Sequence, residues 1–122
     1  MTDEIYFFDS YAIIEIIRGS DSYKRYVSSN IVTAKLNLFE LYYWVCKELN
    51  DINTAKDELM KYSSCILDYD LDIIEKAAEL KLKKRNLSMT DCIGYMLAVK
   101  LDIKFLTGDH EFQNMPNVEF VK

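Results

Sequence analysis

The sequence contains few of the residues that break or cross-link a chain: three glycines, one proline and three cysteines among 122 residues. So little glycine and proline argues against long disordered linkers, and no apolar run reaches the roughly 18–20 residues needed to cross a bilayer. The N-terminus, residues 1–4, carries acids where a signal peptide would carry basic residues. Cys46, Cys65 and Cys92 are odd in number, widely spaced and set among apolar residues. We therefore predict reduced core thiols, rather than a disulfide frame or zinc site, in a cytoplasmic protein without a membrane anchor.

The chain also has a single histidine, His110, and it lacks a glycine-rich phosphate loop and a nucleophile elbow. These absences argue against ATP or dinucleotide binding and against serine hydrolase chemistry. The net charge of −5 argues against a general nucleic-acid coat protein, whose affinity depends on a broad basic surface. The same charge is compatible with a nuclease, because a bound metal neutralises part of the acid at its site.

Half of the residues are hydrophobic, and short apolar runs alternate with stretches of helical spacing. This alternation predicts a three-layer α/β/α sandwich with a mostly parallel central sheet, formed as one domain over residues 1–122. We expect Thr33 to cap the third helix and the Thr54–Asp57 capping box to open the fourth. The predicted strands are 5–8, 31–32, 65–67, 103–106 and 118–121, and the predicted helices are 10–19, 22–27, 33–49, 54–62, 71–85 and 88–101.

Four acidic residues lie at the ends of predicted strands or within predicted helices. Asp9 and Asp109 each follow an apolar, strand-like run, and Asp91 opens a late helix. Glu40 is the only charge in the apolar stretch 36–46. Strand ends and helix starts meet at one rim of a parallel sheet, so we expect the four side chains to lie together. Carboxylates without a Cys or His cluster favour Mg²⁺ or Mn²⁺, and such a metal activating water beside a phosphate is nuclease chemistry.

Each acid also has an ordinary structural explanation. Asp9 is suited to cap a helix, and Asp109 lies in typical turn composition. Asp91 has the spacing of a capping box with Ser88. Glu40 is harder to explain structurally, because burying an unpaired charge among apolar neighbours costs several kcal/mol. We therefore expect its carboxylate to face a wet cleft, a cation or a metal.

Several nearby residues extend this hypothesis. Asn37 shares the helical face of Glu40, Glu111 is an auxiliary ligand or a surface residue, and His110 is a neighbour of the ligands or incidental. The basic run before Asp91 is either a surface for RNA phosphates or the solvated end of a helix. The candidate RNA-binding residues are Lys24, Arg25, Lys81, Lys83, Lys84 and Arg85.

The order of these motifs resembles the PIN domain family, most closely the VapC-type toxin ribonucleases, over essentially the whole chain. The resemblance rests on Phe8-Asp9-Ser10, on residues 37–43, on Thr90-Asp91 and on residues 107–112. It implies an acidic quartet at the four positions above, with Asp9 and Asp109 as the expected direct ligands and with Ser10 and Thr107 in support.

The resemblance further implies Mg²⁺- or Mn²⁺-dependent RNA cleavage, a homodimer and a neutralising antitoxin. We expect the antitoxin to use the acidic pocket and an apolar groove around Ile13, Ile17 and Tyr43. Two alternatives stay open: a PIN nuclease that serves RNA processing without an antitoxin, and an inactive interaction module of the same fold.

Overall fold

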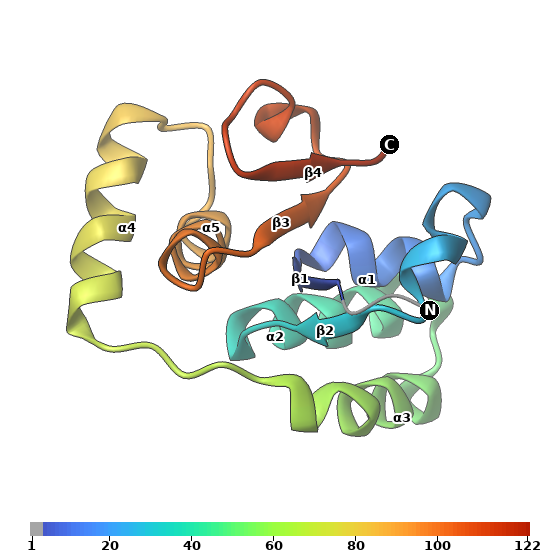
Figure 1. Ribbon diagram of the computed structural model, residues 1–122. Coiled ribbons are helices and arrows are strands. Elements are labelled where there is room, and N and C mark those ends of the chain that lie inside the picture. The colour runs from blue at the N-terminus through green and yellow to red at the C-terminus, as the bar shows by residue number, and fades with distance from the viewer. Residues whose placement is uncertain (1–3) are drawn as a thin grey trace.

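The computed structural model describes residues 4–122; one helix separates the first strand from the second, and four successive helices lie between the second strand and the third (Figure 1). Short helical turns lie between them: the 3-10 turns η1 (Asp21–Tyr26), η3 (Ser63–Cys65) and η4 (His110–Phe112), and the π turn η2 (Val45–Leu49). The main elements are β1 (Ile5–Phe8), α1 (Ser10–Ile17), β2 (Asn30–Val32), α2 (Lys35–Trp44), α3 (Ile52–Tyr62), α4 (Leu71–Lys83), α5 (Met89–Lys100), β3 (Lys104–Thr107) and β4 (Val118–Phe120).

The strands form one sheet in the order β2-β1-β3-β4, and every pairing is parallel. Phe7 on β1 lies opposite Val32 on β2 and Phe105 on β3, which sets the register of the two central strands. This arrangement confirms the predicted α/β/α sandwich with a parallel sheet. All four strands therefore end at the same edge, the rim at which the acidic residues were expected.

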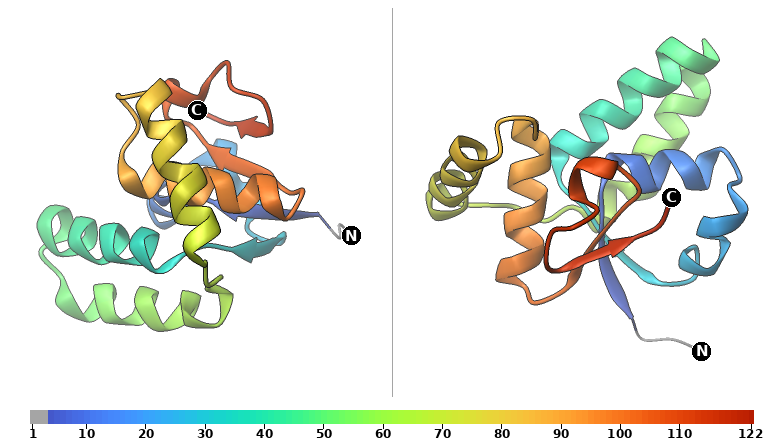
Figure 2. Two further views of the ribbon diagram at one scale, coloured as in Figure 1. Left: turned by 90° about the vertical axis from the view of Figure 1, so that its left-hand side faces the viewer. Right: turned by 90° about the horizontal axis from the view of Figure 1, so that it is seen from above.

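Successive strand residues point to opposite faces of the sheet and form two cores. Tyr6 and Phe8 pack with α1, α2 and α3 on one face, whereas Phe7 and Phe105 pack with α4 and α5 on the other. Figure 2 shows α4 lying outside α5, and α2 running beside α3. The fully buried aromatic rings of the central strands anchor both layers.

Helix α5 approaches the sheet closely because its middle residue, Gly94, has no side chain. A Cβ added at Gly94 would lie 2.8 Å from a ring carbon of Phe7 and 3.2 Å from one of Phe105. Since real Cβ atoms essentially never show a contact of 2.8 Å, any larger residue would force the Phe7 ring or the helix to shift. The approach keeps the first turn of α5, which carries Asp91, close to the end of β1.

The structure corrects the predicted start of α2 and one predicted strand. The N-cap of α2 is Ala34, without a side-chain hydrogen bond, and Thr33 does not cap the helix. Thr33 instead continues the strand: it pairs with Ile66 as a single bridge, and its hydroxyl donates to the Phe8 carbonyl at 2.9 Å. Because only that bridge forms, the strand predicted over 65–67 is absent as a regular element.

Two further boundaries differ from the predictions. Helix α2 keeps α geometry only to Trp44, and the chain continues as the π turn to a left-handed Asn50 at φ 49°. Helix α3 begins two residues before the predicted capping box, because Asp51 accepts from the Thr54 backbone N–H at 3.0 Å. These changes leave the rim unaltered, since both occur at the far ends of their helices.

Cysteine and membrane features are simple in the described part of the chain. Cys46, Cys65 and Cys92 are free thiols, although only Cys92 is fully buried. Within residues 4–122, none of the helices combines the length and the apolar character needed to cross a membrane.

Candidate functional site

Asp9 lies directly after β1 and is almost completely buried, with 3% of its surface exposed. Its Oδ1 accepts from the Ser10 backbone N–H at 2.9 Å, so Asp9 does cap α1. Its Oδ2 accepts from the Thr107 hydroxyl at 2.7 Å, which ties β1 to β3. Burial, and next the Asp91 carboxylate, raise the pKa of Asp9 to about 8. Without a cation, Asp9 is therefore mostly protonated at neutral pH.

Glu40 is linked to Asp9 through Ser10, whose backbone N–H donates to Asp9 and whose hydroxyl donates to Glu40. The Ser10 hydroxyl donates to Glu40 Oε1 at 2.6 Å, joining the first turn of α1 to the middle of α2. The apolar neighbours of Glu40 in the sequence do not enclose it, because Phe39 and Tyr43 are 72% and 59% exposed. Glu40 is half-buried, and its carboxylate lies near enough to Asp9 to help raise the pKa of Asp9.

Asp91 caps helix α5 and also belongs to the group of interacting carboxylates. It forms a full capping box with Ser88: the Ser88 N–H donates to Asp91 Oδ2 at 2.9 Å, and the Asp91 N–H donates to Ser88 Oγ at 3.0 Å. Burial, followed among the charges by Asp109 and Glu40, raises the pKa of Asp91. The cap fixes the carboxylate at the rim, where the other acids already stand.

Asp109 is held by the turn that follows β3. Its N–H donates to Thr107 Oγ1 at 3.1 Å, and its Oδ1 accepts from the Glu111 N–H at 3.0 Å. Gly108 makes this path possible, since an added Cβ would lie 2.3 Å from the Val121 carbonyl oxygen. The glycine therefore lets the chain pass between β4 and α1 and deliver Asp109 to the rim.

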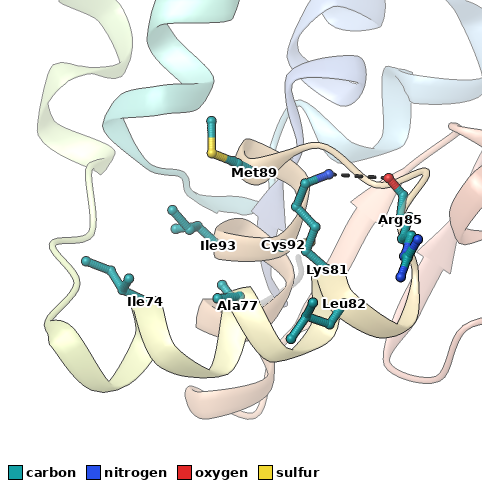
Figure 3. Close-up of a pocket in the computed structure, with 9 residues that line it drawn as sticks. Ile74, Ala77, Lys81, Leu82, Arg85, Met89, Cys92 and Ile93 are labelled. Atoms are coloured by element: carbon teal, nitrogen blue, oxygen red, sulfur yellow. Dashed lines mark hydrogen bonds between the residues drawn. The ribbon is translucent and has the colours of Figure 1, made fainter.

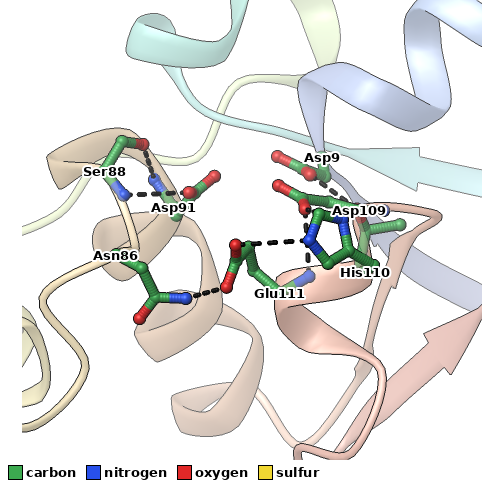
Figure 4. A network of polar contacts seen from close by, with 8 residues as sticks. Asp9, Asn86, Ser88, Asp91, Asp109, His110 and Glu111 are labelled. Carbon is green, nitrogen blue, oxygen red and sulfur yellow. Dashed lines mark hydrogen bonds and ion pairs between the residues drawn. The ribbon is translucent and has the colours of Figure 1, made fainter.

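The loop before α5 reaches across the rim to Glu111. Asn86 donates a side-chain hydrogen bond to Glu111 Oε2 (Figure 4). His110 is 73% exposed and lies 3.9 Å from Asp109 and 3.4 Å from Glu111. Asn86 was missed by sequence reasoning, because an asparagine in a polar loop carries no signal for a partner 25 residues away.

The four predicted acids converge. Figure 4 shows Asp91 pointing from α5 toward Asp9 and Asp109, and Glu40 acts electrostatically on both Asp9 and Asp91. Across residues 4–122, no Lys or Arg forms an ion pair with any of the four. Within the described residues, the site therefore gathers four carboxyl groups without an ion pair to a lysine or an arginine.

The chemistry of this donor set fits a hard divalent cation. Carboxylate oxygens are the ligands that Mg²⁺ and Mn²⁺ prefer, and a buried carboxylate without a positive partner is costly. Each acid is meanwhile held by its own hydrogen bonds, and in the described residues no three Asp, Glu, His or Cys side chains are gathered as one metal-ligating group. Mg²⁺ keeps several waters, so a set of separated carboxylates suits it better than Zn²⁺.

The candidate RNA-binding residues lie in two places: one group is at the end of α4 and on the loop that follows, and the other is on η1. Lys81 Nζ donates to the carbonyls of Arg85 and Leu87 at 3.3 and 2.7 Å, which braces the loop before Ser88. Figure 3 shows the Lys81–Arg85 contact beside an apolar cavity of about 670 Å³ between α4 and α5. Lys83, the last residue of α4, is exposed, as are Lys84 and Arg85 on the loop that follows. On η1, Lys24 pairs with Asp21 at 2.8 Å, and the Arg25 guanidinium lies 4.9 Å from the centre of the Tyr26 ring.

Known structures share this fold at low sequence identity. Mycobacterium tuberculosis VapC20, described as a sarcin-ricin loop cleaving toxin, superposes with a TM-score of 0.76 at 18% identity, covering 96% of this chain and 99% of that one. A toxin–antitoxin complex from Klebsiella pneumoniae gives 0.74 at 19% identity, with 93% and 94% covered. Rickettsia felis VapBC2, bound to a DNA fragment from its promoter, gives 0.72 at 20% identity, with 97% and 99% covered.

Sequence comparisons identify the family. A search of curated protein sequences found no match. The PIN domain, as a family, matches residues 6–118, which include all four acidic residues. The chain belongs to the PIN domain family.

Proposed function

We propose that this protein is a divalent-metal-dependent endoribonuclease of the VapC type, with Asp9, Glu40, Asp91 and Asp109 as its metal-binding and catalytic residues. The observation that carries the proposal is the buried Asp9 beside further carboxylates: burial and the neighbouring Asp91 and Glu40 raise its pKa to about 8. A site built in this way is unfavourable until a cation binds, and a metal held at a sheet rim is suited to phosphodiester hydrolysis.

The side chains of this chain prepare the site in two ways. Asp9 must release its proton when a cation binds, so metal affinity is coupled to pH. Thr107 and Ser10 each donate a hydroxyl proton to a carboxylate, to Asp9 and to Glu40 respectively, which fixes the direction of those oxygens. When bound, Mg²⁺ or Mn²⁺ lowers the pKa of a water and neutralises charge on the phosphate.

The test is RNA cleavage by purified protein with Mn²⁺ or Mg²⁺ and with EDTA, alongside melting temperatures in the same buffers. We expect cleavage and thermal stabilisation with the metal and neither with EDTA. An inactive interaction module would show no stabilisation by Mn²⁺ and no cleavage in any buffer. A nuclease without an antitoxin would cleave equally well, so the neighbouring gene separates that alternative from a toxin.

An antitoxin partner is supported by the toxin–antitoxin complexes among the structural neighbours. The groove expected around Ile13 was wrong, because Ile13 is fully buried in the core. Tyr43 instead belongs to an apolar groove of about 570 Å³ between α2 and α3. We propose that an amphipathic antitoxin helix binds there, covering the exposed rings of Phe39 and Tyr43.

Tyr43→Ser is expected to weaken binding of the proposed antitoxin by at least about 10-fold, because exposed aromatic anchors dominate such interfaces. Isothermal titration calorimetry measures the affinity. Leu71→Ser is the matched control, since Leu71 is 81% exposed on α4 and lies outside the groove. Equal weakening by both variants would contradict this placement.

A homodimer, implied by the resemblance, stays a prediction that light scattering can check.

We also narrow the proposed RNA surface to the end of α4 and the loop that follows it. Replacing Lys83, Lys84 and Arg85 with Gln is expected to weaken RNA binding, and the slope of log affinity against log salt should become shallower by about 0.7 for each phosphate that the protein no longer neutralises. Fluorescence anisotropy at several salt concentrations, in an Asp9→Asn background that leaves the RNA uncut, measures both quantities.

The matched control removes the same charge from another surface: Lys47, Lys56 and Lys61 are replaced with Gln. These lysines lie on η2 and α3, and two of them lie over the rings of Tyr43 and Tyr62. A similar decrease in affinity for both triple variants would mean that only net charge matters. Unaltered affinity in the first variant would return its residues to the role of a solvated helix end.

A further inference from the structure

Asn37 is an uncharged residue buried directly behind the acidic site. Its side chain is completely buried, and its Nδ2 donates to Ser10 Oγ at 3.1 Å. Ser10 in turn donates to Glu40 Oε1 at 2.6 Å. A chain of hydrogen bonds therefore runs from Asn37 on α2, through Ser10 on α1, and back to Glu40 one turn further along α2.

The direction of this chain depends on Asn37. A serine hydroxyl has one proton, and Ser10 Oγ has two acceptors near it: Glu40 Oε1 at 2.6 Å and the Asn37 carbonyl oxygen at 3.4 Å. Because an Asn37 N–H occupies a lone pair of Ser10 Oγ, the amide restrains the rotation of that hydroxyl. The short bond to the carboxylate is thereby favoured over the long one to the backbone.

The side-chain oxygen of Asn37 indicates that the stability of the fold does not explain an asparagine at this position. Asn37 Oδ1 is buried and has no hydrogen-bond partner in the described part of the chain. An unpaired buried oxygen destabilises a fold, and an apolar side chain of similar shape would avoid that cost. Turning the amide round would let Oδ1 take the Ser10 proton, but Glu40 would lose its hydrogen bond and the N–H groups would be unpaired.

We propose that Asn37 is a positioning residue for Glu40: it orients the Ser10 hydroxyl, which holds the Glu40 carboxylate toward Asp9 and Asp91. The inference rests on the proposed function, because it assumes that Glu40 helps to bind a divalent metal. Residues that orient a ligand in this way typically alter metal affinity by about 10–100-fold when they are replaced. The polar residue is then retained for the geometry of the site and not for stability.

The experiment is a Mn²⁺ titration, followed by the electron paramagnetic resonance signal of the free ion. It compares the wild-type protein, Asn37→Leu, Ser10→Ala and the double variant. We expect Asn37→Leu to weaken Mn²⁺ binding by about 10-fold. The melting temperature in EDTA should stay the same or rise, because the unpaired oxygen is removed. Ser10→Ala should weaken binding similarly, and the double variant should be no weaker than Ser10→Ala alone.

The outcomes separate this inference from the proposed function. If the wild-type protein binds no Mn²⁺, both are wrong. If wild-type and Asn37→Leu bind Mn²⁺ equally well, or if Asn37→Leu has its full effect in the Ser10→Ala background, the positioning role alone is wrong. Should leucine prevent folding, Asn37→Ala, which also lacks the donor, is titrated with the same expectations.

Discussion

Replacing Asp9 with asparagine is expected to lower ribonuclease activity by at least about 100-fold, because even residues that only orient a metal ligand are worth about 10–100-fold. The fold should persist. Asn keeps the shape of Asp9, and its carbonyl oxygen can still accept from the Ser10 N–H that caps α1. Since Asp9 is mostly protonated at neutral pH without a cation, the substitution removes little charge from the metal-free protein. Cleavage rates with Mn²⁺ and circular dichroism measure the two effects.

A matched control uses another helix cap. Asp51 caps α3 and accepts from the Thr54 N–H at 3.0 Å, but it is exposed and belongs to none of the contacts at the rim. Asp51→Asn should therefore leave activity unchanged. A folded Asp9→Asn protein with full activity would end the assignment of Asp9 as a ligand. Loss of activity in both variants would point to a general effect of weakening helix caps.

The second large effect is on the pH dependence of the free energy of unfolding, which should differ between the metal-free and the Mn²⁺-bound protein. Folded Asp9 holds its proton up to about pH 8, whereas the unfolded chain releases it near the ordinary value of 3.8. Between these values the folded state binds more protons, so the free energy of unfolding is largest at low pH and falls as the pH rises toward 8. The raised pKa of Asp91 acts in the same direction.

Chemical denaturation in EDTA from pH 5 to pH 9 measures this slope, and Asp9→Asn should flatten it. Added Mn²⁺ should stabilise the wild-type protein increasingly as the pH rises, because a cation competes with the proton for Asp9. If the free energy of unfolding of the metal-free protein does not change between pH 5 and pH 9, the raised pKa of Asp9 is wrong. A stabilisation by Mn²⁺ that survives undiminished in Asp9→Asn would place the metal elsewhere.

The sequence predicted the rim because its signals are local. The run Ile5–Phe8 and the glycine before Asp109 mark strand ends, and Ser88 marks the start of α5. A parallel sheet then brings such ends together whatever the rest of the chain does. The same logic failed where two local options compete: Thr33 is suited to cap a helix, but pairing with Ile66 extends the strand instead.

The environment of Glu40 was harder to predict, since an apolar composition does not say which face of a helix is covered. Phe39 and Tyr43 have the apolar character of core residues in the sequence, yet they are exposed beside the α2–α3 groove. Contacts between polar residues far apart, such as that of Asn86 with Glu111, depend on the finished path of two loops. Neither feature has a periodic pattern that sequence reasoning can detect.

The hydrogen bond from Thr107 to Asp9 joins residues 98 positions apart, and it forms only when β3 has paired with β1. A ribosome that has made α1 through α5 has therefore produced Asp9, Glu40 and Asp91 but not the strand that completes the site. Under the proposed ribonuclease function, the order of synthesis itself would delay activity. The growing chain therefore lacks the complete candidate site until β3 has been made and has inserted beside β1.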